Sequence, residues 1–210
     1  SQTFSQTTDW EAWTSAQIQY RPIKKLKVSF EEQLRLKENI STVDKYFAEI
    51  GVDYKIYKGF KVGLAGRYIR ENDNKGKVQG YENHMRYALY LGYGHKLSKL
   101  NLDYKLQFQT QNEIGVTGAE GDISGKDKLR FKIGTKYNID KWKLDPKFSA
   151  EFFKYMNSSD VFNKLRMAIG TDYSITKSLK IGLFYRWENT LFLSPCSNTN
   201  IIGLGIGYRI

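Results

Sequence analysis

The stretch Asp127-Lys-Leu-Arg-Phe-Lys-Ile-Gly-Thr-Lys-Tyr-Asn-Ile139 alternates between apolar and polar side chains. Successive side chains of an extended strand point to opposite faces, so this period of two predicts a strand with one apolar and one polar face. The same alternation continues from Trp10 to Ile210, and no segment has the period of a long helix. The sequence therefore predicts an all-β protein.

Short and long connections alternate along the chain between the predicted strands. Short connections fall at residues 22–25, 57–59, 98–99, 140–141 and 176–178, and longer polar ones at residues 38–43, 71–82, 111–126, 156–161 and 192–199. Strands are predicted between them at residues 10–21, 26–37, 44–56, 60–70, 83–97, 100–110, 127–139, 142–155, 162–175, 179–191 and 200–210. An antiparallel up-and-down transmembrane β-barrel, with short periplasmic turns and longer extracellular loops, has this pattern.

Eleven segments are predicted, but single-chain bacterial barrels have an even number of strands, so a barrel of about ten to twelve strands is expected. Twelve is preferred, and ten would result if the first segment is not a full member of the wall. Residues 1–9 would then be an N-terminal extension or a short extra strand. No linker rich in Gly, Ser or Pro interrupts the alternation, so residues 1–210 are expected to form a single domain. The chain opens at Ser1 without the regions of a signal peptide, and we expect that this peptide has been removed.

Composition argues against several other classes. Charged residues are 26% and hydrophobic residues 40% of the chain, and no window approaches the apolar run of a membrane-spanning helix. The net charge is +11, but the cations alternate along strands instead of clustering beside exposed aromatic residues, which argues against nucleic-acid binding. The single cysteine, Cys196, excludes an internal disulfide and a multi-cysteine metal site.

The charged side chains are segregated to the polar face, and Glu32 is the clear exception on the apolar face. A Lys or Arg that faces lipid at mid-membrane costs about 2–4 kcal/mol, so this segregation favours a barrel with its charges enclosed and a net basic lumen. The residues predicted to line the lumen are the basic Lys27, Arg35, Lys45, Lys61, Arg67, Arg86, Lys105, Arg130, Lys132, Arg166, Lys180 and Arg186, and the acidic Glu31, Glu49, Asp53, Asp103, Glu151, Asp172 and Glu188.

A soluble barrel of the lipocalin kind would also alternate, with its apolar side chains inside. The aromatic residues favour the membrane alternative, because rings on the apolar face gather near both strand ends, as in the girdles of membrane barrels. The girdle predicted at the short turns is Tyr20, Tyr54, Tyr93, Tyr104, Tyr137, Trp142, Tyr173 and Tyr208. The apolar ladder from Ile202 to Ile210 resembles the C-terminal strand by which insertion machinery recognises such barrels.

A short motif, Gly-x-x-Tyr-x-Ile, recurs along the chain. Its copies begin at Gly51, Gly134, Gly170 and Gly205, and each ends where a short turn or the end of the sequence follows. A looser copy begins at Gly92, and with it the spacing of about 35–42 residues corresponds to one hairpin per repeat.

Several segments carry a resemblance to a known family. They include Asp9-Trp-Glu-Ala-Trp13, Phe30-Glu-Glu-Gln-Leu-Arg35, Gly51-Val-Asp-Tyr54 and Gly203-Leu-Gly-Ile-Gly-Tyr208. With these, nearly the whole chain resembles a family of uncharacterised Gram-negative outer-membrane β-barrel proteins, grouped as a domain of unknown function. The resemblance implies a barrel fold in the outer membrane, and it implies no catalytic or ligand residues.

Enzyme chemistry and metal binding are not expected, and no cofactor is predicted. His84 and His95 are the two histidines. Alternation places His95 towards lipid and His84 inside near the loops, without a nucleophile motif beside it. We expect His84 to bond to a neighbouring strand, and two separated histidines make a zinc site improbable.

These features lead to two hypotheses about function. The first is a narrow, porin-like channel or binding barrel for small anionic solutes, because an excess of cations in a confined lumen attracts anions. The second is a non-transporting accessory subunit of a larger outer-membrane complex. Barrels of this size lie between those filled by side chains and those that leave a channel, so a plugged and an open lumen are both compatible with the sequence. The expected partners are membrane lipid, the insertion machinery and other outer-membrane proteins.

Overall fold

The computed structural model describes residues 7–74, 79–115, 127–139, 143–158, 162–191 and 197–210. These residues form eleven strands and no α-helix, so none of the described chain is a helix able to cross a membrane. The strands are β1 (Thr7–Ile23), β2 (Leu26–Lys37), β3 (Thr42–Tyr57), β4 (Phe60–Asp73), β5 (Gly80–Leu97), β6 (Leu100–Glu113), β7 (Lys128–Tyr137), β8 (Leu144–Tyr155), β9 (Lys164–Ser174), β10 (Leu179–Thr190) and β11 (Ser197–Arg209).

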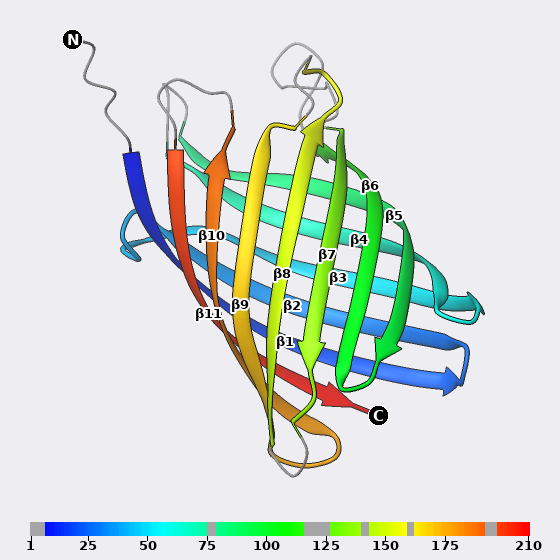
Figure 1. Ribbon diagram of the computed structural model, residues 1–210. Helices are drawn as coiled ribbons and strands as arrows, with labels where there is room; N and C mark the ends of the chain where they lie inside the picture. Colours follow the sequence, from blue (N-terminus) through cyan, green and yellow to red (C-terminus); the bar gives the residue numbers. More distant parts are fainter. Residues whose placement is uncertain (1–6, 75–78, 116–126, 140–142, 159–161, 192–196) are drawn as a thin grey trace.

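The strands form one closed barrel in which each strand pairs with its sequence neighbours. Figure 1 shows the strands steeply tilted around the barrel. All consecutive pairs are antiparallel, and β1 closes the barrel by pairing in parallel with β11, from Thr7 opposite Ser197 to Gln19 opposite Arg209. The all-β barrel and the range of ten to twelve strands are confirmed.

The preference for twelve strands is wrong, because the described residues contain eleven. That preference assumed that the first and last strands run antiparallel, which requires an even number. A parallel pair forms slanted but complete backbone hydrogen bonds, so the barrel closes without a further strand. Thr7, Thr8 and Asp9 extend β1 itself, and the earlier residues lie outside the described part of the chain.

The barrel has two different rims. Short turns such as those joining Ile23 to Leu26, Tyr57 to Phe60 and Leu97 to Leu100 gather at one end, which we call the turn rim. β1 and β11 both begin at the opposite end, the loop rim, where β2 also ends and β3 begins. The chain therefore enters the barrel at the loop rim and leaves it at the turn rim (Figure 1).

The outer wall is apolar and the interior is polar. Ile50 and Leu183 are each 58% exposed on the outside, and Leu64 and Ile169 are each 61% exposed. Buried polar side chains inside include Gln33, Gln107, Gln109, Gln111, Glu151 and Glu188. A soluble barrel has the reverse arrangement, so the lipocalin alternative does not describe this chain, whereas an outer-membrane barrel exposes such a wall to hydrocarbon.

The copy of the repeated Gly-x-x-Tyr motif on β9 has a packing role in this wall. Its Tyr lies three residues after its Gly, so the two positions face opposite sides of the strand. Tyr173 is 43% exposed on the outer wall, while Gly170 faces inward against β10. A Cβ added at Gly170 would lie 2.6 Å from the Leu183 carbonyl oxygen and 2.9 Å from Phe184 Cβ. Gly170 is therefore needed for the packing of β9 against β10. At Gly51, Gly134 and Gly205 an added Cβ would instead meet side-chain atoms of Ser29, Asp103 and Ser15.

Gly170→Ala is expected to destabilise the barrel by about 1–3 kcal/mol, because the new methyl group overlaps backbone atoms of β10. Gly207→Ala is the matched control, since a Cβ there meets no atom within 4 Å. Both substitutions reduce the conformational freedom of the unfolded chain by the same amount, so the difference in stability between the two variants isolates the overlap. Urea unfolding in liposomes measures it. Equal stability of the two variants would contradict this packing role of Gly170.

Candidate functional site

The loop-rim half of the interior is filled by side chains. Trp13 and Phe47 are each 3% exposed, and Ile201 is fully buried at 0%. The guanidinium carbon of Arg35 lies 3.6 Å from the centre of the Trp13 ring, and that of Arg67 lies 3.6 Å from the centre of the Phe47 ring. The faces of aromatic rings attract guanidinium groups, so this guanidinium–aromatic layer (Trp13, Phe47, Arg35 and Arg67) is held together inside the barrel.

Two buried carboxylates bind the cations next to this layer. Glu151 lies 2.6 Å from Arg130 Nη2 and 3.0 Å from Arg166 Nη1. Glu188 lies 2.5 Å from Arg166 Nη2 and 2.9 Å from Lys164 Nζ. Charge-assisted hydrogen bonds of this kind compensate for removing the ions from water. We call these five residues the ionic cluster.

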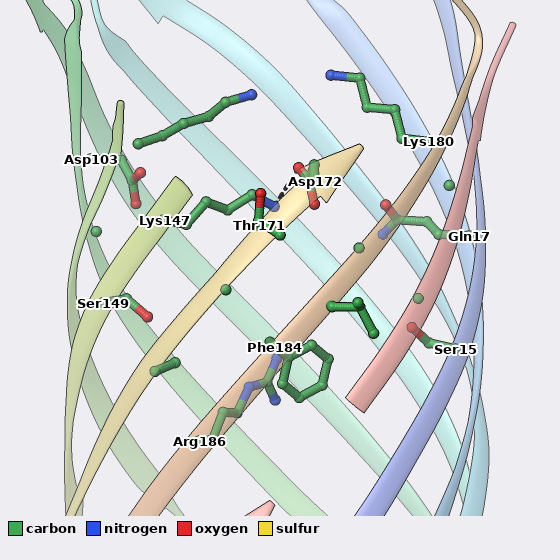
Figure 2. Close-up of a pocket in the computed structure, with 18 of the residues that line it drawn as sticks. Ser15, Gln17, Asp103, Lys147, Ser149, Thr171, Asp172, Lys180, Phe184 and Arg186 are labelled. Carbon is green, nitrogen blue, oxygen red and sulfur yellow. Dashed lines mark ion pairs between the residues drawn. The ribbon is translucent and has the colours of Figure 1, made fainter. Parts of the chain in front are cut away.

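A cavity of about 680 Å³ lies on the turn-rim side of the ionic cluster. Figure 2 shows side chains of β1, β6 and β8–β10 directed into it. The space exists because many inward positions here lack a side chain. The glycines that line it are Gly134, Gly170, Gly182, Gly205 and Gly207.

Cations dominate the cavity, and some have no counter-ion. Lys147 pairs with Asp172 across β8 and β9, as Figure 2 shows, and Lys136 Nζ lies 2.7 Å from Asp145. Other cations of this wall, Lys132, Lys180 and Arg186, form no ion pair with another described residue. Arg186 instead lies over the Phe184 ring, 4.0 Å from its centre. This cavity is the candidate functional site.

The predicted lumen residues occupy inward positions of their strands but do not form a single group. Those lining the cavity are Glu31, Asp103, Arg130, Lys132, Glu151, Arg166, Asp172, Lys180 and Arg186. Arg35, Arg67, Glu49, Arg86 and Glu188 lie among the side chains that fill the interior, with Glu49 2.6 Å from Arg67 and Arg86 bonded to Gln111. Lys27, Asp53, Lys61 and Lys105 lie on β2–β6, where Lys27 Nζ is 2.5 Å from Asp53. Tyr90 also donates to Asp53.

The girdle residues face outward where the structure describes them. Tyr20, Tyr54, Tyr93, Tyr137, Tyr173 and Tyr208 are exposed, from 36% to 50%. Tyr104 is half-buried because it stacks on Tyr93 and His95, with ring centres 6.3 Å and 6.1 Å away. Trp142 lies outside the described residues.

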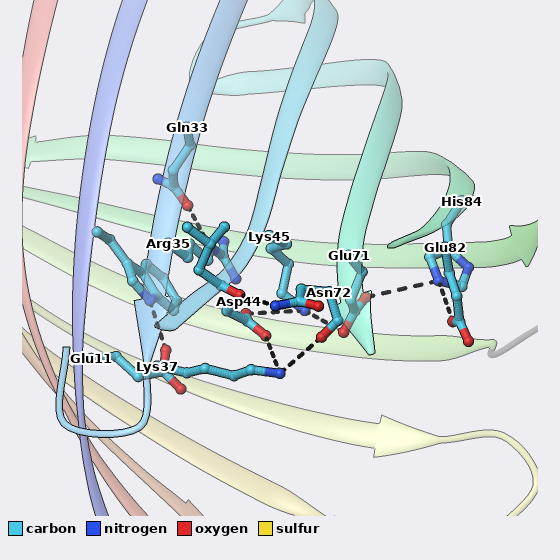
Figure 3. A network of polar contacts seen from close by, with 12 residues as sticks. Glu11, Gln33, Arg35, Lys37, Asp44, Lys45, Glu71, Asn72, Glu82 and His84 are labelled. Atoms are coloured by element: carbon cyan, nitrogen blue, oxygen red, sulfur yellow. Dashed lines mark hydrogen bonds and ion pairs between the residues drawn. The ribbon is translucent and has the colours of Figure 1, made fainter. Parts of the chain in front are cut away.

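A second polar network lies near the loop rim (Figure 3). Lys45 Nζ lies 2.7 Å from Glu71 and 3.3 Å from Asp44. The buried His84 ring places Nε2 at 3.3 Å from Glu82, also on β5, and 4.0 Å from Glu71 on β4. No three His, Cys, Asp or Glu side chains are arranged to hold a metal ion in the described ranges. Cys196 lies outside those ranges.

Comparison with known proteins identifies the family. The family described as "Protein of unknown function (DUF2490)" matches residues 10–194. The chain belongs to this family. The predicted resemblance is therefore confirmed. A separate search of curated proteins found no match.

Solved structures similar to this DUF2490 chain include an outer membrane protein of Vibrio cholerae and the β domain of a Bordetella autotransporter. OmpT of Vibrio cholerae, folded in vitro, has a TM-score of 0.43 and 12% identity over 81% of this chain and 53% of its own. The β domain of the Bordetella autotransporter Brka has a TM-score of 0.47 and 9% identity over 86% of this chain and 82% of its own. The DUF2490 chain thus spans about half of the Vibrio protein, and a likeness at this level concerns the fold alone.

The sequence prediction missed the aromatic residues inside the DUF2490 barrel. Trp13, Phe47 and Phe153 are buried within it, and Phe153 lies 4.9 Å from the Arg130 guanidinium carbon. Alternation places Trp13 inside, because it shares its strand face with the polar Glu11 and Ser15. The predicted lumen set contained only charged residues, so it did not include Trp13.

Glu151→Gln is expected to destabilise the DUF2490 barrel by about 3–5 kcal/mol, because the buried Arg130 and Arg166 both lose a charged partner. Asp172→Asn is the control, since its partner Lys147 is 41% exposed and such a pair contributes about 0–1 kcal/mol. The free energy of unfolding in urea distinguishes them. Similar losses in both variants would show that the ionic cluster has no special role.

Proposed function

We propose that this protein is an integral outer-membrane barrel whose cavity at the turn rim binds small anionic solutes. The observation that carries the proposal is that Lys132, Lys180 and Arg186 border a cavity of about 680 Å³ and form no ion pair with any other described residue. Confinement by a low-dielectric wall strengthens the attraction between such cations and an anion. Carboxylates, including those of acidic sugars, are the proposed ligand class.

The filled loop-rim half favours a binding barrel over a channel. Trp13, Phe47 and Ile201 occupy the interior beyond the ionic cluster, so the cavity is expected to be closed on that side. The proposed role is non-enzymatic, because no nucleophile motif accompanies the inward His84, which lies beside Glu82 and Glu71.

The proposed location rests on the apolar outer wall. Short turns face the periplasm in outer-membrane barrels, so the cavity would open to the periplasm and the loop rim would lie at the cell surface. Membrane lipid would cover the wall, and the insertion machinery would bind β11, whose outer face carries Ile202, Leu204, Ile206 and Tyr208.

Citrate is a suitable probe of the proposed site. Lys132→Gln and Lys180→Gln are each expected to weaken citrate binding by about three- to tenfold, because each removes one unpaired cation from the cavity wall. Lys58→Gln, in the exposed β3–β4 turn, removes the same charge and is expected to leave binding unchanged. Isothermal titration calorimetry in detergent gives the affinities.

Filling the cavity tests the same site by shape. Gly207→Trp would project a ring into the cavity. Gly66→Trp is the control, because its ring would project from the outer wall. An added Cβ meets no atom within 4 Å at either glycine. Only the first variant should lose citrate binding. Equal binding by both, or competition by the cation spermidine, would contradict the proposal.

The purified protein is expected to show no steady conductance in planar bilayers, because side chains fill the loop-rim half of the lumen. Adding a general porin to the same bilayer provides the positive control. A steady anion-selective conductance would restore the channel hypothesis. A cation-selective conductance would contradict both the channel and the binding site.

A further inference from the structure

A groove of about 520 Å³ crosses the outer wall between β11 and β4. We call it the β1–β3 groove, because its base lies on those strands. Its outward-facing side chains are Thr14, Ala16, Glu32, Leu34, Tyr46, Ala48, Tyr68, Leu204 and Ile206. These strands lie side by side where the parallel pair closes the barrel (Figure 1).

The shape of the groove follows from side-chain size. Ala16, Glu32 and Ala48 lie directly opposite one another on three adjacent strands. The two alanines leave a depression on either side of Glu32. Larger side chains border it, with Tyr68 beyond Ala48 and Ile206 beyond Ala16. Small residues at a membrane interface allow another backbone to approach closely.

Glu32 is unusual for its position. It is exposed on the apolar wall and forms no hydrogen bond or ion pair with any described residue. It lies midway along β2, between Leu26 at the turn rim and Lys37 at the loop rim. At about 3.3 Å per residue it is about 20 Å along the strand from Leu26. A strand tilt of about 45° converts this to a depth of about 14 Å, which is near the middle of a hydrocarbon core of about 30 Å.

An ionisable side chain at this depth is costly in lipid and is therefore a functional-site candidate. The cost falls when a cation or a hydrogen-bond donor lies against the carboxylate. A lipid acyl chain supplies neither. A second copy of this chain, packed by twofold symmetry through the same groove, would bring two Glu32 carboxylates together.

We infer that the β1–β3 groove binds a membrane-embedded polypeptide segment that places one cationic side chain, Lys or Arg, against Glu32. The segment packs its apolar side chains between Tyr46, Tyr68 and Leu204, and its backbone approaches over Ala16 and Ala48. This inference rests on the proposed membrane location of the barrel. It is independent of the anion cavity, which lies inside the wall.

A synthetic membrane-spanning peptide tests the inference. The probe is a Leu/Ala helix with one central Lys, and its control has Leu at that position. Energy transfer between labelled peptide and barrel in liposomes measures binding. We expect the Lys peptide to bind wild-type protein about tenfold more tightly than the Leu peptide. Glu32→Gln should abolish this preference, and Glu32→Lys should transfer it to a peptide with central Glu.

The double variant Glu32→Gln/Ile169→Glu is the matched control. It keeps one carboxylate on the outer wall but moves it to β9, where Ile169 is 61% exposed. Recovery of the Lys preference in this variant would overturn the inference, because any lipid-facing carboxylate would then suffice. Dimers of the barrel that strengthen in Glu32→Gln would overturn it in favour of a second copy.

Membrane insertion is measured first, by protection of the barrel from protease and by its heat-modifiable mobility on gels. A wild-type barrel that stays outside the liposomes would overturn both the proposed location and the inference. An inserted barrel with no preference for the Lys peptide would overturn the inference alone and leave the anion site unaffected.

Discussion

An ionised side chain enclosed by a β-barrel is separated from bulk water, and it requires another source of stabilisation. This chain supplies two. Glu151 and Glu188 bind their neighbouring cations directly, within the ionic cluster. Arg35 and Arg67 lie over the rings of Trp13 and Phe47. Lys132, Lys180 and Arg186 border the cavity without an ion pair to another described residue, and this incomplete compensation is the basis of the proposed function.

The limited volume inside the barrel explains the inward glycines. A β-strand offers every second position to the interior, and in a barrel of this size long side chains at all of them would overfill it. Gly170 allows β9 and β10 to pack at close range, whereas Gly207 leaves open space. The glycines thus concentrate the free volume at the turn rim, and the aromatic residues close the loop-rim half.

The faces of the strands were predictable from the sequence because they depend only on alternation. Lys132 and Ile133 fall on opposite sides of β7 for this reason, and so do Glu31 and Glu32 on β2. The closure of the barrel was not predictable in the same way, because no local pattern specifies which strand pairs with β1. The even-number rule then led to the wrong count.

The grouping of the inward residues also lay beyond the sequence. Whether Arg166 meets Glu151, Glu188 or both depends on the stagger between β8, β9 and β10. Stagger is a property of the whole closed sheet, so alternation placed these residues inside without saying which would touch. The inward position of Trp13 was predictable from alternation, but the polar side chains on the same face suggested that no aromatic residue lay inside.

The parallel pair between β1 and β11 has a topological consequence. In an even-stranded barrel the first and last strands run antiparallel, so the two termini meet at one rim and a short linker can join them. Here Thr7 and Arg209 lie at opposite rims, separated by about 40 Å of strand. A short linker therefore cannot join the end of β11 to the start of β1. A circular permutant of this barrel would need a linker long enough to span its full height.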